Sequence, residues 1–180
     1  MKIGRFEIGR DHPPFVIAEM SGNHNQSLDR ALAIVDAAAA TGAQAIKLQT
    51  YTADTMTLDI REGDFVISDP KSLWAGRSLH DLYDEAHTPW EWHRPILARC
   101  KALRMIGFSS PFDATAVDFL ETLDVPCYKV ASFEMTDLPL AARHCLMATV
   151  YAVEQVLRDH LHPAKINLAS FGNVVPHLHW

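Results

Sequence analysis

The sequence lacks several features that would identify a cofactor or a partner directly. It contains only three cysteines, and no two of them have the Cys-x-x-Cys spacing of a metal or redox site. No GxGxxG or GxxxxGK[ST] fingerprint follows any strand-like segment, which removes the usual dinucleotide and nucleotide sites. Excess positive charge is also lacking, because the net charge is −6. The chain therefore offers no basic field for nucleic acid, although a local pocket for a small anion remains open.

Long hydrophobic runs are missing as well. No stretch reaches the roughly 20 apolar residues of a transmembrane helix, and the N-terminus lacks the apolar core of a signal peptide. We therefore expect a cytoplasmic protein with no membrane partner. Cys100, Cys127 and Cys145 are then expected to be reduced thiols. A hydrophobic content of 48% is ample for a core, and 180 residues is the length of one ordinary domain.

Apolar periodicity predicts alternating strands and helices. Residues 15–20 and 45–50 are short, nearly continuous apolar runs, as expected for buried strands of a parallel sheet. Between them Ser27 is a suitable N-cap, apolar residues recur at helical spacing, and Gly42 stands where a helix end favours glycine. The third and fourth predicted strands are residues 105–109 and 127–132.

The segments between these strands carry signals of their own. Residues 2–8 predict a small hairpin or an edge strand, and residues 51–77 predict a long loop because they show little periodicity. A short helix is predicted for residues 78–86. Residues 88–91 predict the start of another helix, with Thr88 as the N-cap of a capping box. Asp113 is predicted to cap the helix after the third strand.

Polar residues stand at the ends of the predicted strands. Parallel strands place their carboxyl ends on one side, where ligands bind in barrels and open α/β sheets. Lys47 and Gln49 have the same parity and so point to one face, and a lysine on a buried strand is costly unless an anion meets it. The residues at the four strand ends are Glu19, then Lys47 with Gln49, then Ser109 with Ser110, then Lys129 with Ser132.

Two lysines and several hydroxyls converging from different strands predict an anion site, most simply for a phosphate together with a carboxylate. Glu19 has two interpretations: it orients a substrate hydroxyl or shuttles a proton, or it forms a buried ion pair with a lysine. For Lys47 and Lys129 the alternative is a solvated strand edge. For Ser109 and Ser110, which precede a proline, the alternative is turn formation.

Four motifs, in order and spacing, resemble the sialic acid synthase family. The likeness covers residues 3–140, and the Met-Ser-Gly form of the first motif and residues 82–93 are most similar to the pseudaminic acid synthase branch. The motifs are residues 18–25 (Ala-Glu-Met-Ser-Gly-Asn-His-Asn), 47–51 (Lys-Leu-Gln-Thr-Tyr), 109–112 (Ser-Ser-Pro-Phe) and 128–134 (Tyr-Lys-Val-Ala-Ser-Phe-Glu).

The resemblance implies a (β/α)₈ barrel that condenses phosphoenolpyruvate with an open-chain amino sugar aldehyde, with C–O cleavage and release of phosphate. In the pseudaminate branch the sugar is a diacetamido-trideoxy hexose and the product is a nonulosonic acid. A divalent metal, manganese or magnesium, polarises the aldehyde oxygen. The family's metal-binding histidines lie on late barrel strands and have no counterpart here, because His177 and His179 stand in a different context.

The resemblance also assigns site residues, through the positions that match the family's motifs. The family usually has threonine where Ser110 stands, a change that keeps the hydroxyl. The predicted site comprises Glu19 as the catalytic residue, Lys47, Gln49, Ser110, Lys129 and Ser132 as phosphoenolpyruvate contacts, and Asn23 and His24 in a loop near the substrate.

The likeness stops after Leu140. Residues 1–140 are therefore expected to be the N-terminal part of a barrel synthase domain, and residues 141–180 a divergent or truncated tail, with no C-terminal antifreeze-like domain. A full barrel needs about 250 residues, so the expected fold class is α/β, a partial barrel of about four βα units. The tail has two interpretations, an internal deletion or an altered reading frame. Within it, residues 150–160 and 165–171 predict a helix and a strand.

Half a barrel leaves open sheet edges and exposes apolar faces. Three functions are compatible with it. The first is the N-terminal portion of a pseudaminate-type synthase, inactive or weak alone. The second is a non-catalytic half-barrel module that keeps an anion pocket or joins a homodimer that completes the barrel. A Schiff-base aldolase using Lys129 or Lys47 is a third.

Overall fold

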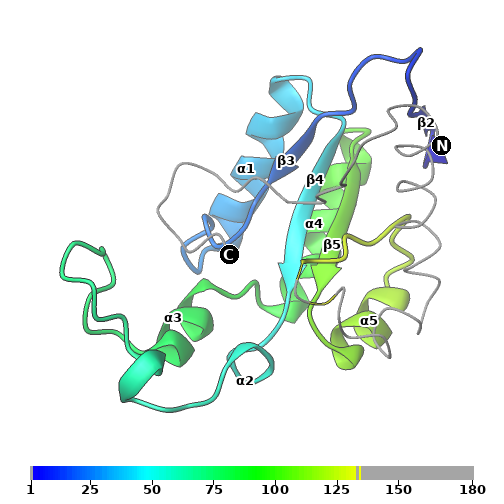
Figure 1. Cartoon of the computed structure of the whole chain (residues 1–180). Helices are drawn as coiled ribbons and strands as arrows, with labels where there is room; N and C mark the ends of the chain where they lie inside the picture. The colour runs from blue at the N-terminus through cyan, green and yellow to red at the C-terminus, as the bar shows by residue number, and fades with distance from the viewer. Residues whose placement is uncertain (1, 133, 135–180) are drawn as a thin grey trace.

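A three-stranded parallel sheet forms the centre of the computed structural model, which describes residues 2–132 and 134 (Figure 1). The predictions for residues 150–160 and 165–171 lie outside this described part. The strands lie in the order β3-β4-β5, and their arrows point toward the end of the sheet where α2 and α3 lie (Figure 1). Their bounds are β3 (Ile17–Glu19), β4 (Ala45–Thr50) and β5 (Ile106–Pro111).

The first helix and its caps agree with the sequence prediction. Helix α1 (Leu28–Ala40) connects β3 to β4. The Ser27 hydroxyl accepts the backbone N–H of Arg30, which satisfies one of the free amides at the helix start. Gly42 follows the helix end with φ +84°, a conformation that glycine adopts without steric cost.

Two further helices flank β5. Helix α4 (Trp90–Ala102) precedes it and α5 (Ala114–Glu121) follows it. The carboxylate of Asp113 accepts the backbone N–H groups of Thr115 and Ala116, so the predicted cap of α5 is confirmed.

The two faces of the sheet have different neighbours. Parallel pairing places Ile46 opposite Gly107 and Ala18, so these residues share one face of the sheet. That face packs into the hydrophobic core beneath α1 and α4. Val35 of α1 and Ile96 of α4 are fully buried in that core. Alternation along a strand sends the odd-numbered residues of β4, which include Lys47 and Gln49, to the opposite face.

The prediction of a fourth strand at residues 127–132 is wrong. In residues 127–132 the described structure has one parallel bridge, between Tyr128 and Ser109, and one hydrogen bond from the Lys129 N–H to the Ser109 carbonyl at 3.1 Å. The partner in both contacts is Ser109 of β5, and the chain turns at Ser132. The segment nevertheless lies next to β5, so the predicted parallel order continues.

The predicted cap at Thr88 is wrong. Helix α4 begins at Trp90 with Pro89 at the N-cap position and no side-chain cap. The Thr88 hydroxyl is instead buried against Nε2 of His24 at 3.1 Å. A partner distant in sequence has displaced the local capping arrangement.

The predicted first strand and the predicted long loop are also corrected. Strand pairing is confined to Ile17–Glu19 of residues 15–20. Between residues 51 and 77 the chain forms α2 (Ala53–Met56) and a short 3₁₀ helix, η1 (Gly63–Phe65). The predicted helix that follows is confirmed as α3 (Leu79–Ala86), with Ser78 as its N-cap.

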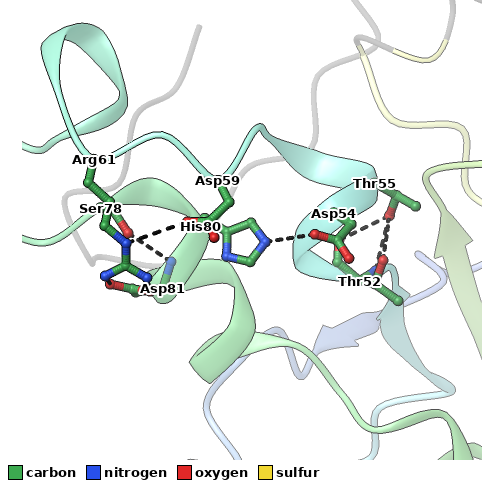
Figure 2. A network of polar contacts seen from close by, with 8 residues as sticks. All are labelled: Thr52, Asp54, Thr55, Asp59, Arg61, Ser78, His80 and Asp81. Atoms are coloured by element: carbon green, nitrogen blue, oxygen red, sulfur yellow. Dashed lines mark hydrogen bonds and ion pairs between the residues drawn. The ribbon is translucent and has the colours of Figure 1, made fainter.

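Side-chain contacts hold this segment against α3. Nε2 of His80 lies 2.8 Å from Oδ1 of Asp54 (Figure 2), and the Arg61 guanidinium makes two contacts with Asp81, at 3.0 and 2.9 Å. These pairs are exposed and each stabilises the fold only modestly. They connect helix α2 and the residues after it to α3.

The remaining elements agree with the sequence prediction. Residues 2–8 form a hairpin of β1 (Lys2–Ile3) and β2 (Phe6–Glu7). Within the described residues Cys100 and Cys127 are free thiols, and Cys145 lies outside them. In the same part of the chain no helix is long and apolar enough to cross a membrane.

Candidate anion-binding site

A row of polar side chains crosses the sheet on the face opposite α1 and α4. Parallel pairing places Glu19 opposite Lys47, and Lys47 opposite Phe108. Two residues further along, Gln49 is opposite Ser110. Because paired residues of neighbouring strands share a face, these side chains lie together near the carboxyl ends of the strands.

Lys47 and Glu19 form an ion pair within this row. The Lys47 ammonium contacts Oε2 of Glu19, and the exposed fractions of the two side chains are 8% and 24%. Oε1 of Glu19 is buried and has no hydrogen-bond partner in the described structure. The ion-pair interpretation of Glu19 is therefore confirmed, and one carboxylate oxygen remains able to accept.

Ser110 contributes a second unused polar atom. The residue is 1% exposed, and its Oγ has no hydrogen-bond partner among the described residues. Leaving a buried hydroxyl unpaired costs about 1–3 kcal/mol. A ligand oxygen at this position would satisfy the hydroxyl.

Gln49 is oriented by a residue from another loop. The Ser21 hydroxyl lies 3.3 Å from Oε1 of Gln49 and donates to it. Ser21 has φ +49°, a left-handed conformation that a serine adopts only with some strain. With its oxygen engaged, the Gln49 amide presents its N–H₂ group as a donor.

Lys129 adds a second positive charge. Burial and then the Lys47 ammonium lower the pKa of Lys129, while Glu19 and Glu134 act in the opposite direction. Two ammonium groups that destabilise one another in a partly buried place are stabilised when an anion lies between them. The electrostatics thus favour an anionic ligand at this end of the sheet.

The structure does not bring every predicted residue into this row. His24 is fully buried, where Nε2 contacts Thr88 and Nδ1 accepts the Gln26 N–H at 3.2 Å. Asn23 is exposed, and its side chain donates to the Met20 carbonyl at 2.8 Å. These contacts shape the loop after β3. Ser132 lies in an exposed turn.

Sequence reasoning missed three residues that the structure places near the predicted ones. Phe108 shares the row with Lys47, and strand alternation two residues before Ser110 is the signal that could have identified it. Ser21 had no signal beyond its place in a polar loop. Glu134 acts on Lys129 and lies in the fourth motif, although its role was not predicted.

The described residues do not fit the metal implied by the family resemblance. Within residues 2–132 and 134 no group of three or more histidine, cysteine, aspartate or glutamate side chains is placed to hold a metal ion. Glu19 is already engaged by Lys47. No catalytic step through a metal is therefore derived.

Fold and site together define a class of protein. Alternating parallel strands and helices, with buried cations and donors at the carboxyl ends of the strands, are typical of α/β proteins that bind anionic small molecules. Residues 34–149, more than half of the chain, match the model of the NeuB family. The chain therefore belongs to the NeuB family.

The curated relatives agree with this membership. The chain is 45% identical over 137 residues to pseudaminic acid synthase of Campylobacter jejuni, which covers 76% of this chain and 39% of the relative. It is 44% identical over 128 residues to pseudaminic acid synthase of Helicobacter pylori, covering 71% and 37%. The chain thus spans less than two fifths of the length of these two relatives.

Solved structures show a similar fold. A sialic acid synthetase from Leptospira borgpetersenii, solved with citrate, has a TM-score of 0.65 and 26% identity, covering 78% of this chain and 44% of that one. The spore coat polysaccharide biosynthesis protein SpsE of Bacillus subtilis has a TM-score of 0.59 and 34% identity, covering 78% and 35%. The predicted α/β class is confirmed, and closure into part of a barrel stays a prediction.

A second family match overlaps the first. Residues 122–180 match the HIT domain. The overlap with the NeuB match runs from residue 122 to residue 149. The predicted end of the likeness at Leu140 lies inside this overlap, and the NeuB match continues to residue 149.

Proposed function

We propose that this chain carries the phosphoenolpyruvate end of a nonulosonic acid synthase site of the pseudaminate type. The observation that carries the proposal is the buried Ser110 hydroxyl, which has no partner in the described structure and lies in the same row as Lys47 and Glu19. Phosphoenolpyruvate has both a phosphate and a carboxylate, so it needs several cations and donors at once.

In this proposal each residue has a defined task. Lys47 and Lys129 neutralise the phosphate and the carboxylate of the ligand, and Ser110 and Gln49 donate hydrogen bonds to its oxygens. Low exposure of Lys47 and Ser110 strengthens these contacts, because water competes weakly there. Ser132, Asn23 and His24 remain predicted contacts or loop residues.

Glu19 has a separate role at the other side of the ligand. One of its oxygens holds Lys47, and the other is free to accept from a sugar hydroxyl or to exchange a proton with the reacting carbonyl. The second substrate would be an open-chain diacetamido-trideoxy hexose. Its aldehyde carbon would bond to the phosphoenolpyruvate methylene carbon, and the aldehyde oxygen would take up a proton. Water would add at C2, and cleavage of the C2–O bond would then release phosphate and leave a keto group.

Calorimetry of the full chain with phosphoenolpyruvate tests the proposal. Saturable binding in the unaltered chain, lost in Lys47→Met and kept in the surface control Lys71→Met, is the expected result. Phosphate release on addition of the sugar and manganese would extend the result to turnover. Absence of binding by the folded chain would overturn the proposal.

Two other outcomes separate the alternatives. Binding without phosphate release would assign the chain as an anion-binding module instead of a synthase. Trapping of pyruvate on Lys129 or Lys47 by borohydride would assign a Schiff-base aldolase. Analytical ultracentrifugation of the same sample tests the homodimer that would complete the barrel.

A further inference from the structure

Three buried polar side chains form a connected chain behind the anion-binding row. Oγ1 of Thr50 lies 2.6 Å from Oγ of Ser109 and 2.8 Å from Nε2 of His93. Thr50 and His93 are fully buried and Ser109 is 1% exposed. They come from β4, β5 and α4, and they lie on the helix-facing side of the sheet, opposite to Lys47 and Gln49.

The direction of these hydrogen bonds follows from the chemistry of the groups. Nδ1 of His93 lies 3.3 Å from the Pro89 carbonyl, and a carbonyl oxygen only accepts, so Nδ1 carries the proton. Nε2 is then an acceptor, and the Thr50 hydroxyl donates to it. The Thr50 oxygen in turn accepts from the Ser109 hydroxyl.

The surroundings of His93 keep the ring neutral. Burial lowers the pKa of His93 to about 4, and His24 also lowers it. Glu91 and the backbone of Pro89 and Trp90 act in the opposite direction and do not outweigh the burial. The rings of His93 and Phe119 of α5 meet in a T-shaped arrangement with their centroids 5.3 Å apart, and the phenyl ring contributes no charge.

Ser109 links this chain to the candidate site. Its main chain pairs with β4 through Leu48 and with Tyr128 through the parallel bridge. Its carbonyl accepts the Lys129 N–H at 3.1 Å. The next residue is Ser110, whose side chain points to the opposite face. Fixing the Ser109 hydroxyl therefore fixes the backbone that carries both Ser110 and Lys129.

We propose that Thr50 and His93 are positioning residues that act through Ser109 to hold the Ser110 hydroxyl and Lys129 where an anion binds. The inference rests on the proposed function. A neutral histidine suits this role, since protonated Nε2 would cease to accept from Thr50 and the chain of hydrogen bonds would break. Threonine suits it because one hydroxyl can donate to the ring and accept from Ser109 at the same time.

The experiment compares Thr50→Val with Thr50→Ser in the full chain. Valine keeps the shape and removes the hydroxyl, whereas serine keeps the hydroxyl and removes a methyl group. Thr50→Val is expected to weaken phosphoenolpyruvate binding about tenfold, and Thr50→Ser is expected to retain it. A role in packing alone would reverse this order, because serine leaves the larger gap.

Ser78→Ala is the control for a loss of stability. Ser78 is buried, its hydroxyl caps α3, and it takes no part in the proposed site. This variant is expected to lower the melting temperature without changing the affinity. An equal loss of affinity in Ser78→Ala would show that binding follows stability in general, which would overturn the inference.

NMR provides a readout that does not depend on binding. The imidazole nitrogens of His93 are expected to report a proton on Nδ1, and Thr50→Val is expected to shift the amide signals of Ser110 and Lys129. A proton on Nε2, or unchanged amides in Thr50→Val, would overturn the inference. If the unaltered chain fails to bind phosphoenolpyruvate, the proposed function fails, and these spectra alone decide the positioning role.

Discussion

Glu19 and Lys47 lie opposite one another in neighbouring parallel strands, and their side chains form an ion pair on the face of the sheet away from the helices. A buried pair of this kind is weak evidence of stability, because desolvation of the two charges offsets much of their attraction. Its placement beside the unpartnered Ser110 hydroxyl is more informative. The pair orients the Lys47 side chain on the same face as that hydroxyl, where the proposed anion would contact both.

Removing the Lys47 charge is expected to lower both the affinity for phosphoenolpyruvate and the stability of the fold. Lys47→Met should weaken phosphoenolpyruvate binding by roughly a hundredfold, since truncating one partner of a buried charge contact costs about 2–5 kcal/mol. It should also lower the free energy of unfolding by up to about 3 kcal/mol, because Glu19 is left without its partner. Calorimetry and urea unfolding measure the two effects.

A double variant controls for the stability loss. Lys47→Met combined with Glu19→Gln removes both charges and should recover most of the free energy of unfolding, while binding stays weak. Recovery of binding in this double variant would show that Lys47 does not contact the anion.

Ser110→Ala is expected to cost affinity and not stability. The hydroxyl has no hydrogen-bond partner in the described structure, so its removal breaks no internal contact. The affinity for phosphoenolpyruvate should fall about tenfold, the effect of losing one hydrogen bond to a charged group. Ser110→Thr retains the hydroxyl and serves as the matched variant, with near-normal affinity expected. Equal affinities in all three proteins would remove Ser110 from the site.

Stability is expected to decline in mild acid because of buried neutral histidines. Burial lowers the pKa of His93 to about 4 and also lowers the pKa of His24, whereas both are near 6.5 when unfolded. The unfolded chain therefore binds more protons, and stability that is complete above about pH 6.5 is lost as the pH falls toward 4. His93 alone accounts for a loss of the order of 3 kcal/mol.

Urea unfolding at pH 7 and pH 4.5 measures this acid dependence, and His93→Asn isolates the contribution of one ring. The variant should lose less stability between the two pH values than the unaltered chain. His80 contributes with the opposite sign, because the hydrogen bond that its ring donates to the Asp54 carboxylate raises its pKa. A pH dependence identical in both proteins would contradict the assignment of His93 as a buried neutral ring.

Gly107→Ala tests the packing of α4 on β5. A methyl group at Gly107 would lie 2.6 Å from Cδ2 of Leu97 and 3.2 Å from Sγ of Cys100, so something must shift. The expected loss is about 1–3 kcal/mol of unfolding free energy, typical of an overpacked core. Adding Leu97→Val shortens the opposing side chain and should recover part of it. Urea unfolding of the single and double variants measures both effects, and an unchanged free energy of unfolding in Gly107→Ala would contradict this close contact of α4 with β5.

Local signals accounted for the elements that the sequence predicted well. Ser27 and Asp113 are N-caps in the structure as predicted, because a capping hydroxyl or carboxylate satisfies amides within the next three residues. The predicted strand 45–50 also matches β4, because a short apolar run between two turn signals is typical of a buried strand. Thr88 does not cap α4 because its hydroxyl is hydrogen-bonded to His24, which is 64 residues away in the sequence.

The sequence alone therefore determined the order of strands and helices, the polar residues at the strand ends and the resemblance to the synthase family. Tertiary structure decided which of these polar residues act together. Ser109 and Ser110 are adjacent and chemically identical, but strand alternation sends Ser109 to Thr50 and His93 and leaves Ser110 beside Gln49. Parity along one strand is visible in the sequence. The register between strands, which places Glu19 against Lys47, depends on pairing across the sheet and appears only in the folded chain.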